Sequence, residues 1–307
     1  MAQTITQPPL VSRNCPICPG AATSRPYAQA NIDTRKLNNF AYSSRKTPEY
    51  MHYRLEECTQ CDLIYAADIP STNYLGQAYL EADFASSLEA HYASRTYQTV
   101  VAKLQTKLPD KIGALDIGAG DGCFLEKLLE LGFSHVQGVE PSTAPIRAAK
   151  TEIRPLIKHS LFKAQDYPQE SYSLITCFQT IEHVDDPLEL ARSAAKLLKP
   201  QGALLIICHN RRSLVNTLLG AKSPIRDIEH LQLFSPQSAR RLMEQAGYIN
   251  IQVRPIVNRY PLDYWFRLVP LSQGTKSKLT AIATRLGIIQ LPLPMPVSNL
   301  AVLGYKP

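Results

Sequence analysis

The chain has 307 residues, 45% of them hydrophobic and 19% charged, so it is long enough for an α/β domain plus a smaller module and too apolar to be disordered. Its net charge of +7 is scattered, with no basic run beyond pairs such as Arg211-Arg212, which argues against nucleic-acid binding. Residues 1–11 lack the pattern of a signal peptide, and prolines interrupt the apolar C-terminal stretch. We therefore expect a cytoplasmic protein without a transmembrane segment.

Two C-x-x-C pairs stand in the first 70 residues, Cys15 with Cys18 and Cys58 with Cys61. Four thiolates on two such turns suit tetrahedral Zn²⁺, and the metal would be structural because the four ligands close its coordination shell. A rubredoxin-like iron site fits the same ligands, and four reduced cysteines in a small core are a further alternative. The other three cysteines stand singly in apolar patterns, which indicates a reducing compartment.

Helical periodicity starts after a boundary that we expect near residue 70. Tyr, Ala and Leu recur at spacings of three and four over residues 74–108, which predicts a helix there. Its tyrosines could close over a ligand site or simply pack against the core, and residues 71–108 are therefore interpreted as a lid or linker.

From Lys111 onward, short apolar runs alternate with amphipathic stretches, the pattern of a parallel sheet wrapped by helices. We expect a doubly wound sheet that is Rossmann-like. The predicted strands cover residues 112–117, 135–140, 156–159, 173–178 and 203–208, and the helices between them cover 124–131, ending at Gly132, and 188–198, ending at the turn 199–202.

The C-terminal part begins with a helix from Ser235-Pro236 to Gly247. A half-exposed strand follows over 249–257, with Ile249, Ile251, Val253 and Val257 on one face, and a last strand covers 299–305. The insertion 258–297 between them is rich in aromatic residues. It could complete an acceptor pocket or touch a membrane surface.

A glycine-rich loop follows the first strand of the sheet, with Asp116 before it and glycines at 118, 120 and 122. Such a loop lets a nucleotide-like ligand approach the backbone and the N-terminus of the next helix. Glu140 ends the second strand 20 residues after Gly120, where a carboxylate can accept hydrogen bonds from ribose hydroxyls. The alternative role of Glu140 is to stabilise the next helix start. The G-x-G-x-G spacing lacks the last glycine of a dinucleotide loop, which disfavours NAD.

Four segments in this order resemble the successive motifs of the class I S-adenosylmethionine-dependent methyltransferases. The segments are Leu115-Asp116-Ile117-Gly118-Ala119-Gly120-Asp121-Gly122, Gly138-Val139-Glu140-Pro141-Ser142, Gln179-Thr180-Ile181-Glu182-His183-Val184-Asp185-Asp186-Pro187 and Leu198-Lys199-Pro200-Gln201-Gly202. The resemblance implies a seven-stranded sheet whose last strand is antiparallel.

The resemblance also implies how the chain holds S-adenosylmethionine. Asp116 and the glycines would hold the methionine part, Glu140 the ribose, and Phe162 would lie against the adenine, where many relatives place an acid instead. Asp166 would replace that acid if the loop were shifted. The candidate cofactor-binding residues are Asp116, Gly118, Ala119, Gly120, Glu140, Pro141, Phe162 and Gln179.

The cysteine pairs and the segment Asp62-Leu63-Ile64-Tyr65-Ala66 are similar to the zinc-ribbon-like start of many bacterial methyltransferases that act on sugars or natural products. The chain is therefore interpreted as an enzyme that methylates a small-molecule, sugar or glycan-type acceptor. A catalytically silent adenosyl-binding interaction protein and a nicotinamide-dependent oxidoreductase are the alternatives.

Proton removal from the acceptor needs a base, and histidine suits pH 7. Glu182 and His183 follow the fourth strand, at the edge where open α/β sheets bind their ligands, although they could merely organise the loop. His230 and His209 are further candidates for the base. Some similar quinone-biosynthetic O-methyltransferases use a metal with an acid at the position of Gln179, so the glutamine argues against metal-assisted transfer.

These patterns predict four parts: residues 1–70 as a zinc-binding module, 71–108 as lid or linker, 109–257 as the Rossmann-like domain, and 258–307 as acceptor-site insertion and final strand. Neither the acceptor atom nor the oligomeric state follows from the sequence.

Overall fold

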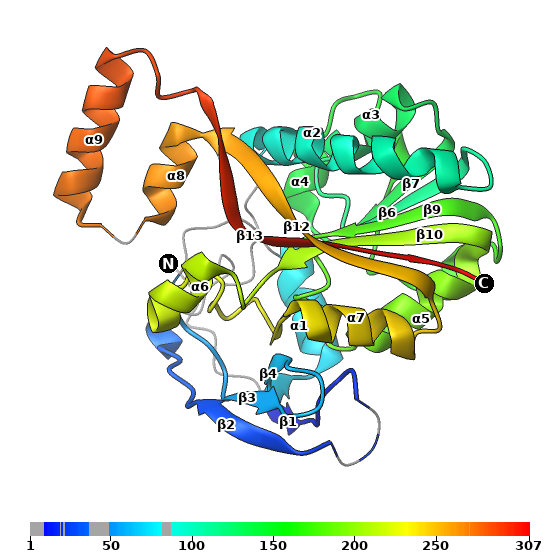
Figure 1. Cartoon of the computed structure of the whole chain (residues 1–307), viewed down its shortest axis with the longest axis horizontal. Helices are drawn as coiled ribbons and strands as arrows, with labels where there is room; N and C mark the ends of the chain where they lie inside the picture. The colour runs from blue at the N-terminus through cyan, green and yellow to red at the C-terminus, as the bar shows by residue number, and fades with distance from the viewer. Residues whose placement is uncertain (1–8, 19, 21, 37–48, 82–86, 270) are drawn as a thin grey trace.

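The computed structural model describes residues 9–18, 20, 22–36, 49–81, 87–269 and 271–307 (Figure 1). Its central sheet contains β6 (Ile112–Ile117), β7 (Ser134–Glu140), β8 (Ile157–His159), β9 (Tyr172–Phe178), β10 (Leu198–His209), β12 (Ile249–Pro261) and β13 (Pro292–Tyr305). The strand order is β12-β13-β10-β9-β6-β7-β8, and β13 runs antiparallel to both of its neighbours. This confirms the predicted doubly wound, seven-stranded sheet.

Helices cover both faces of this sheet (Figure 1). On one face, α2 (Ser87–Leu104) and α3 (Cys123–Glu130) share a core with Ala203, Leu205 and Ile207 of β10. On the other, α5 (Pro187–Leu197) and α7 (Pro236–Gln245) share a core with Leu204, Ile206 and Cys208. Successive side chains of a strand point to opposite faces, so a strand covered on both sides is apolar throughout.

The helix ends agree with the sequence prediction. α3 is followed by Gly132 with φ of 85°, and α7 begins with a capping box in which Ser235 accepts the backbone N–H of Ser238. The turn predicted at residues 199–202 lies inside β10 instead, where the pairing with β9 shifts register between Leu198 and Ala203.

The N-terminal part forms two small sheets. β1 (Leu10–Ser12) pairs with β5 (Asp68–Pro70), and β2 (Ser24–Ala28), β3 (Leu55–Cys58) and β4 (Ile64–Ala66) continue into β11 (Gln232–Leu233). Since β11 belongs to the later part of the chain, strand pairing crosses the boundary expected near residue 70.

The helical segment expected over 74–108 consists of α1 (Thr72–Glu81) and α2, and residues 82–86 of that prediction lie outside the described residues. Shorter elements are α4 (Thr143–Ala148), α6 (Leu214–Leu219) and the 3-10 turns η1 (Thr34–Lys36), η2 (Gln105–Lys107), η3 (Arg154–Leu156), η4 (Ala164–Asp166) and η5 (Gly220–Lys222). In the described part of the chain, no helix has the length and apolar character needed to cross a membrane.

The predicted insertion, residues 258–297, consists mainly of strands and helices. β12 and β13 continue as an antiparallel pair to Pro261 and Pro292, and α8 (Leu262–Leu268) and α9 (Gln273–Arg285) form the tip of an arm that protrudes from the sheet (Figure 1). The alternation predicted for residues 249–257 was wrong at both ends, because Ile249 is 46% and Val257 48% exposed. The register of β12 against β13 shifts between Ile256 and Asn258, which turns Asn258 inward instead.

Candidate functional site

The glycine loop after β6 folds over the end of β7. Gly118 and Ala119 donate their backbone N–H groups to the carbonyl of Val139 at 2.9 and 3.0 Å. A Cβ on Gly118, whose φ is 79°, would lie 2.1 Å from Oγ1 of Thr180, whereas a Cβ on Gly120 would meet no atom within 4 Å. Gly118 is therefore required by the fold, and Gly120 faces open space.

Two buried carboxylates lie at the adjacent ends of β6 and β7. Asp116 accepts a hydrogen bond from Thr176 Oγ1 at 2.6 Å, and burial raises its pKa to about 7. Glu140 accepts the backbone N–H groups of Gly120 and Ser142 at 2.9 and 2.8 Å, and burial raises its pKa as well. A cation bound beside them would stabilise the ionised form of both groups.

A cavity of about 790 Å³ extends from these carboxylates. This volume lies within the range of sites that enclose a cofactor or a small molecule. All eight candidate cofactor-binding residues line it: Asp116, Gly118, Ala119, Gly120, Glu140, Pro141, Phe162 and Gln179.

One rim of the cavity holds the aromatic candidate for adenine contact. Phe162 is half-buried and stacks on Tyr167 with ring centroids 5.8 Å apart. Helix α1 covers the neighbouring Leu161, since a Cβ on Gly76 would lie 2.8 Å from Leu161 Cδ1. Asp166, the alternative, pairs with Lys158 at 2.8 Å and is not among the lining residues.

Gln179 directly follows β9 and has an unusual backbone. Its φ is 51°, a conformation that non-glycine residues adopt rarely and often at functional sites. Its N–H donates to Ile207 at 2.7 Å, and its side-chain Nε2 is buried without a hydrogen-bond partner in the described part of the chain. The amide is thus placed to donate to a ligand in the cavity.

Three histidines converge on the part of the cavity away from β7. The ring centroids of His183 and His230 are 4.9 Å apart, and those of His230 and His209 are 5.1 Å apart. Nδ1 of His183 lies 3.0 Å from the carbonyl of Glu229, and Nδ1 of His230 lies 2.9 Å from that of Ile225. Because a carbonyl only accepts, Nδ1 carries the proton in both neutral rings and the lone pair is on Nε2.

His209 has a different environment. It is paired through Nδ1 with Oδ1 of Asn299 at 2.9 Å, and burial lowers its pKa to about 4. A ring this hard to protonate suits hydrogen bonding better than proton removal near pH 7.

Glu182 does not line the cavity. It is completely buried, one carboxylate oxygen accepts the backbone N–H of His209 at 2.8 Å, and burial raises its pKa to about 7. This position favours a structural role for Glu182, in which its hydrogen bond to His209 fixes the end of β10.

The far wall of the cavity comes from the arm. Tyr260, Tyr264 and Trp265 pack on one another with ring centroids 4.3 to 5.4 Å apart, and all three line the cavity. Asn258 lies beside them, is 3% exposed, and its Oδ1 has no hydrogen-bond partner among the described residues. The sequence prediction missed Asn258, although the break in the β12 alternation after Val253 was a signal.

Helix α1 bridges the two halves of the site. The hydroxyl of Tyr79 donates to the carbonyls of His183 at 3.2 Å and Glu229 at 3.5 Å, and the Tyr79 carbonyl accepts from Ser142 Oγ at 2.9 Å. Of the tyrosines in the predicted lid segment, Tyr79 and Tyr97 line the cavity.

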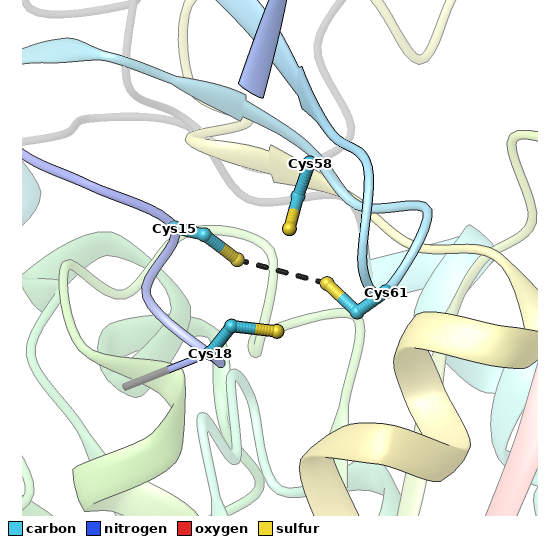
Figure 2. Close-up of side chains that lie close together, drawn as sticks. All are labelled: Cys15, Cys18, Cys58 and Cys61. Atoms are coloured by element: carbon cyan, nitrogen blue, oxygen red, sulfur yellow. Dashed lines mark hydrogen bonds between the residues drawn. The ribbon is translucent and has the colours of Figure 1, made fainter. Parts of the chain in front are cut away.

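Figure 2 shows the side chains of Cys15, Cys18, Cys58 and Cys61 pointing toward one another from two turns. All four are buried, their Sγ atoms lie within 4.8 Å of one another, and Cys15 Sγ is 3.6 Å from Cys61 Sγ. Among the described residues, no other group of three or more His, Cys, Asp or Glu side chains has this geometry. The donor set fits a closed tetrahedral metal site.

Arg13 links this cysteine cluster to the loop that carries His183. From two positions before Cys15, its guanidinium donates to the carbonyls of Asp185 at 2.5 Å and Leu231 at 2.8 Å, and to Oε1 of Gln232 at 3.0 Å. The amide of Gln232 in turn donates to the carbonyls of Ile181 and Val184. The N-terminal module therefore supports the part of the cavity that the histidines line.

Comparison with known proteins agrees with this architecture. The family model described as "Methyltransferase domain" matches residues 90–253, just over half of the chain, and the chain belongs to that family. It is a class I S-adenosylmethionine-dependent methyltransferase, as the order of the four motifs predicted.

Relatives and solved structures of similar type are known from several organisms. The chain is 26% identical to a ubiquinone biosynthesis O-methyltransferase of Aliivibrio fischeri over 167 residues (48% of this chain, 70% of the relative), and 27% identical to that of Hydrogenovibrio crunogenus over 168 residues (48% and 68%). A SAM-dependent methyltransferase structure from Thermotoga maritima is 20% identical, with a TM-score of 0.47, and the match covers 72% of this chain and 94% of that one.

Proposed function

We propose that the chain transfers a methyl group from S-adenosylmethionine to a small polar acceptor of the sugar or glycan type. One observation carries the proposal: a single cavity has two buried carboxylates and an open glycine loop at one end and three histidines with an aromatic wall at the other. We refer to these as the donor end and the acceptor end.

At the donor end, each candidate residue has a contact available to the cofactor. Asp116 would face the cationic methionine part. The carboxylate of Glu140 accepts two backbone hydrogen bonds, and its remaining lone pairs would accept hydrogen bonds from the ribose hydroxyls. Gly120 would let the cofactor approach the loop, and Gln179 would donate from its side-chain amide. Phe162 would pack on the adenine ring.

At the acceptor end, His183 is our first candidate for the base. When bound, the cofactor supplies an electrophilic methyl carbon. The site would hold the acceptor atom in line with that carbon, so that the new bond would replace the bond to sulfur, and Nε2 of His183 would take the proton that the acceptor loses. His230 is the second candidate, and Tyr79 and Glu229 hold the loop of His183 in place.

The lining of the acceptor end favours a ring with several hydroxyl groups. Asn258 and Asn299 offer neutral amides, and Tyr260 with Tyr264 offers a flat apolar surface. The relatives are named for O-methylation in ubiquinone biosynthesis, so transfer to an oxygen of an aromatic acceptor is the second candidate.

The test is methyl transfer from tritiated S-adenosylmethionine to two acceptor pools, nucleotide-activated sugars and hydroxylated quinone precursors. Label in the sugar pool supports the proposal, and label in the quinone pool selects the second candidate. An absence of transfer to either pool and to whole-cell extract, despite tight cofactor binding, would indicate a catalytically silent binding protein.

We further propose that the four cysteines bind one structural Zn²⁺. Cys58→Ser should reduce zinc from near one equivalent per chain to near zero and lower the melting temperature, because the metal is coupled to folding of the module. Cys123→Ser, a half-buried cysteine outside the cluster, is the matched control and should keep its zinc. Elemental analysis decides, and wild-type protein that is metal-free and insensitive to chelators would refute the site.

A further inference from the structure

Most side chains of helix α9, at the tip of the arm, are not buried against the rest of the protein. Of its thirteen residues only Ala283 is buried, while Ile282 and the following Leu286 are 57% and 65% exposed. The segments around it add further exposed apolar side chains: Val269, Leu271, Ile288 and Leu291. Single exposed apolar residues are normal, but a group of six on one short arm indicates a surface that contacts something.

The exposed residues of the helix share one face. Ile282 and Leu286 are four positions apart, and the half-buried Leu279, three positions before Ile282, continues this face toward the packed side that holds Ala283. With about 3.6 residues per turn, Lys278 and Arg285 fall on the solvent-side margin of this face, whereas the half-buried Lys276 falls on the same side as Ala283. The helix contains no acidic residue, so its charge is uniformly positive.

The arm also borders the acceptor end of the cavity. Tyr264, Trp265 and Val269, at the base of the α8–α9 tip, line the cavity. Helix α6, at the same end of the molecule in Figure 1, contributes Val215 and Leu219 to the lining and exposes Leu214 and Leu218. A partner on this surface would lie next to the acceptor end.

We propose that the arm binds an anionic lipid surface, with the exposed apolar side chains of α9 and its flanking segments in the boundary between headgroups and acyl chains and with Lys278 and Arg285 on the lipid phosphates. Exposed apolar side chains beside Lys278 and Arg285, on a helix too short to cross a bilayer and without an acidic residue, suit contact with an anionic lipid surface. A second copy of the chain explains the positive margin less well, because two copies of α9 would repel each other.

The experiment is flotation of the full-length protein with vesicles of phosphatidylcholine containing phosphatidylglycerol, and with vesicles of phosphatidylcholine alone. Wild-type protein should bind the anionic vesicles and lose binding at high salt. Lys278→Gln with Arg285→Gln should weaken partitioning about 25-fold, roughly fivefold for each charge. Ile282→Asp with Leu286→Asp should weaken it at least tenfold.

Leu129→Asp is the matched control, because Leu129 is an exposed leucine on α3, far from the arm in Figure 1. It should bind vesicles as the wild type does, and all variants should keep the wild-type melting temperature, since the changed side chains are exposed. Equal vesicle binding by wild type and arm variants would overturn the proposal. The proposal would also be overturned if the wild-type protein did not bind vesicles and sedimentation showed that it dimerises through the arm. The assay needs neither cofactor nor acceptor, so its failure would leave the proposed transfer reaction intact.

Discussion

The donor end and the acceptor end of the cavity are built in different ways. The donor end comes mainly from residues 116–142, which connect two adjacent parallel strands and close on each other through short backbone hydrogen bonds. The acceptor end draws single residues from distant segments, His183 and His230 from two loops, Asn258 from the arm and Asn299 from the last strand. A site of the first kind is fixed by local sequence and strand topology, whereas one of the second kind depends on how distant elements dock.

The largest expected effect is at the acceptor end. His183→Ala should lower kcat about a hundredfold or more while the Kd for S-adenosylmethionine stays nearly unchanged, because general-base catalysis typically contributes factors of ~10² to 10⁴. Single-turnover rates and calorimetry on the same preparation separate the two quantities. A variant with full rate would move the assignment to His230, and a loss of stability alone would make the residue structural.

The next largest effect is on cofactor affinity, and it should differ between two glycines of the donor end. Gly120→Val should weaken S-adenosylmethionine binding at least tenfold, because its side chain would occupy ligand space, and should also lower stability, because the φ of 57° strains a β-branched residue. Gly118→Val should lower the melting temperature strongly as well, because its side chain would collide with Thr180. Unchanged S-adenosylmethionine affinity in folded Gly120→Val would show that Gly120 does not face the cofactor.

A smaller effect, on the KM for the acceptor, is expected from a substitution in the arm. Asn258→Ala should raise the KM for the acceptor severalfold and leave cofactor affinity unchanged, because a buried amide that recognises a hydroxyl contributes about 1 kcal/mol. Val257→Ala is the control, since Val257 points to solvent one residue away. A changed cofactor Kd in the Asn258 variant would contradict the division of the cavity into two ends.

The smallest effect concerns pH. The pKa of Glu182 is raised to about 7 in the folded protein, so its contribution to stability is complete below its ordinary pKa near 4.5 and is lost as the pH rises toward 7. Glu182→Gln cannot ionise and should show a shallower fall in the free energy of unfolding between pH 5 and 7. Some fall should remain, because Asp116 has a similarly raised pKa. Urea titrations at three pH values check this, and an unchanged slope would contradict the assignment.

The sequence predicted that Asp116 and Glu140 are neighbours for a physical reason. Parallel strands bring their carboxyl ends to one edge, so Asp116 and Glu140 had to lie side by side once their strands were recognised. It did not predict Glu182 beneath the cavity or Asn258 inside it, because the first depends on the hydrogen bond to His209 and the second on a register shift in β12. Nor could it predict that Arg13 holds the loop of His183, 170 residues further along the chain.

Calorimetric titration of the purified protein with S-adenosylmethionine and, separately, with NADH tests the central claim that the donor end is an adenosylmethionine site. We expect one S-adenosylmethionine per chain, affinity at least tenfold weaker in Glu140→Ala, and no NADH binding. Tight NADH binding without S-adenosylmethionine binding would contradict the account.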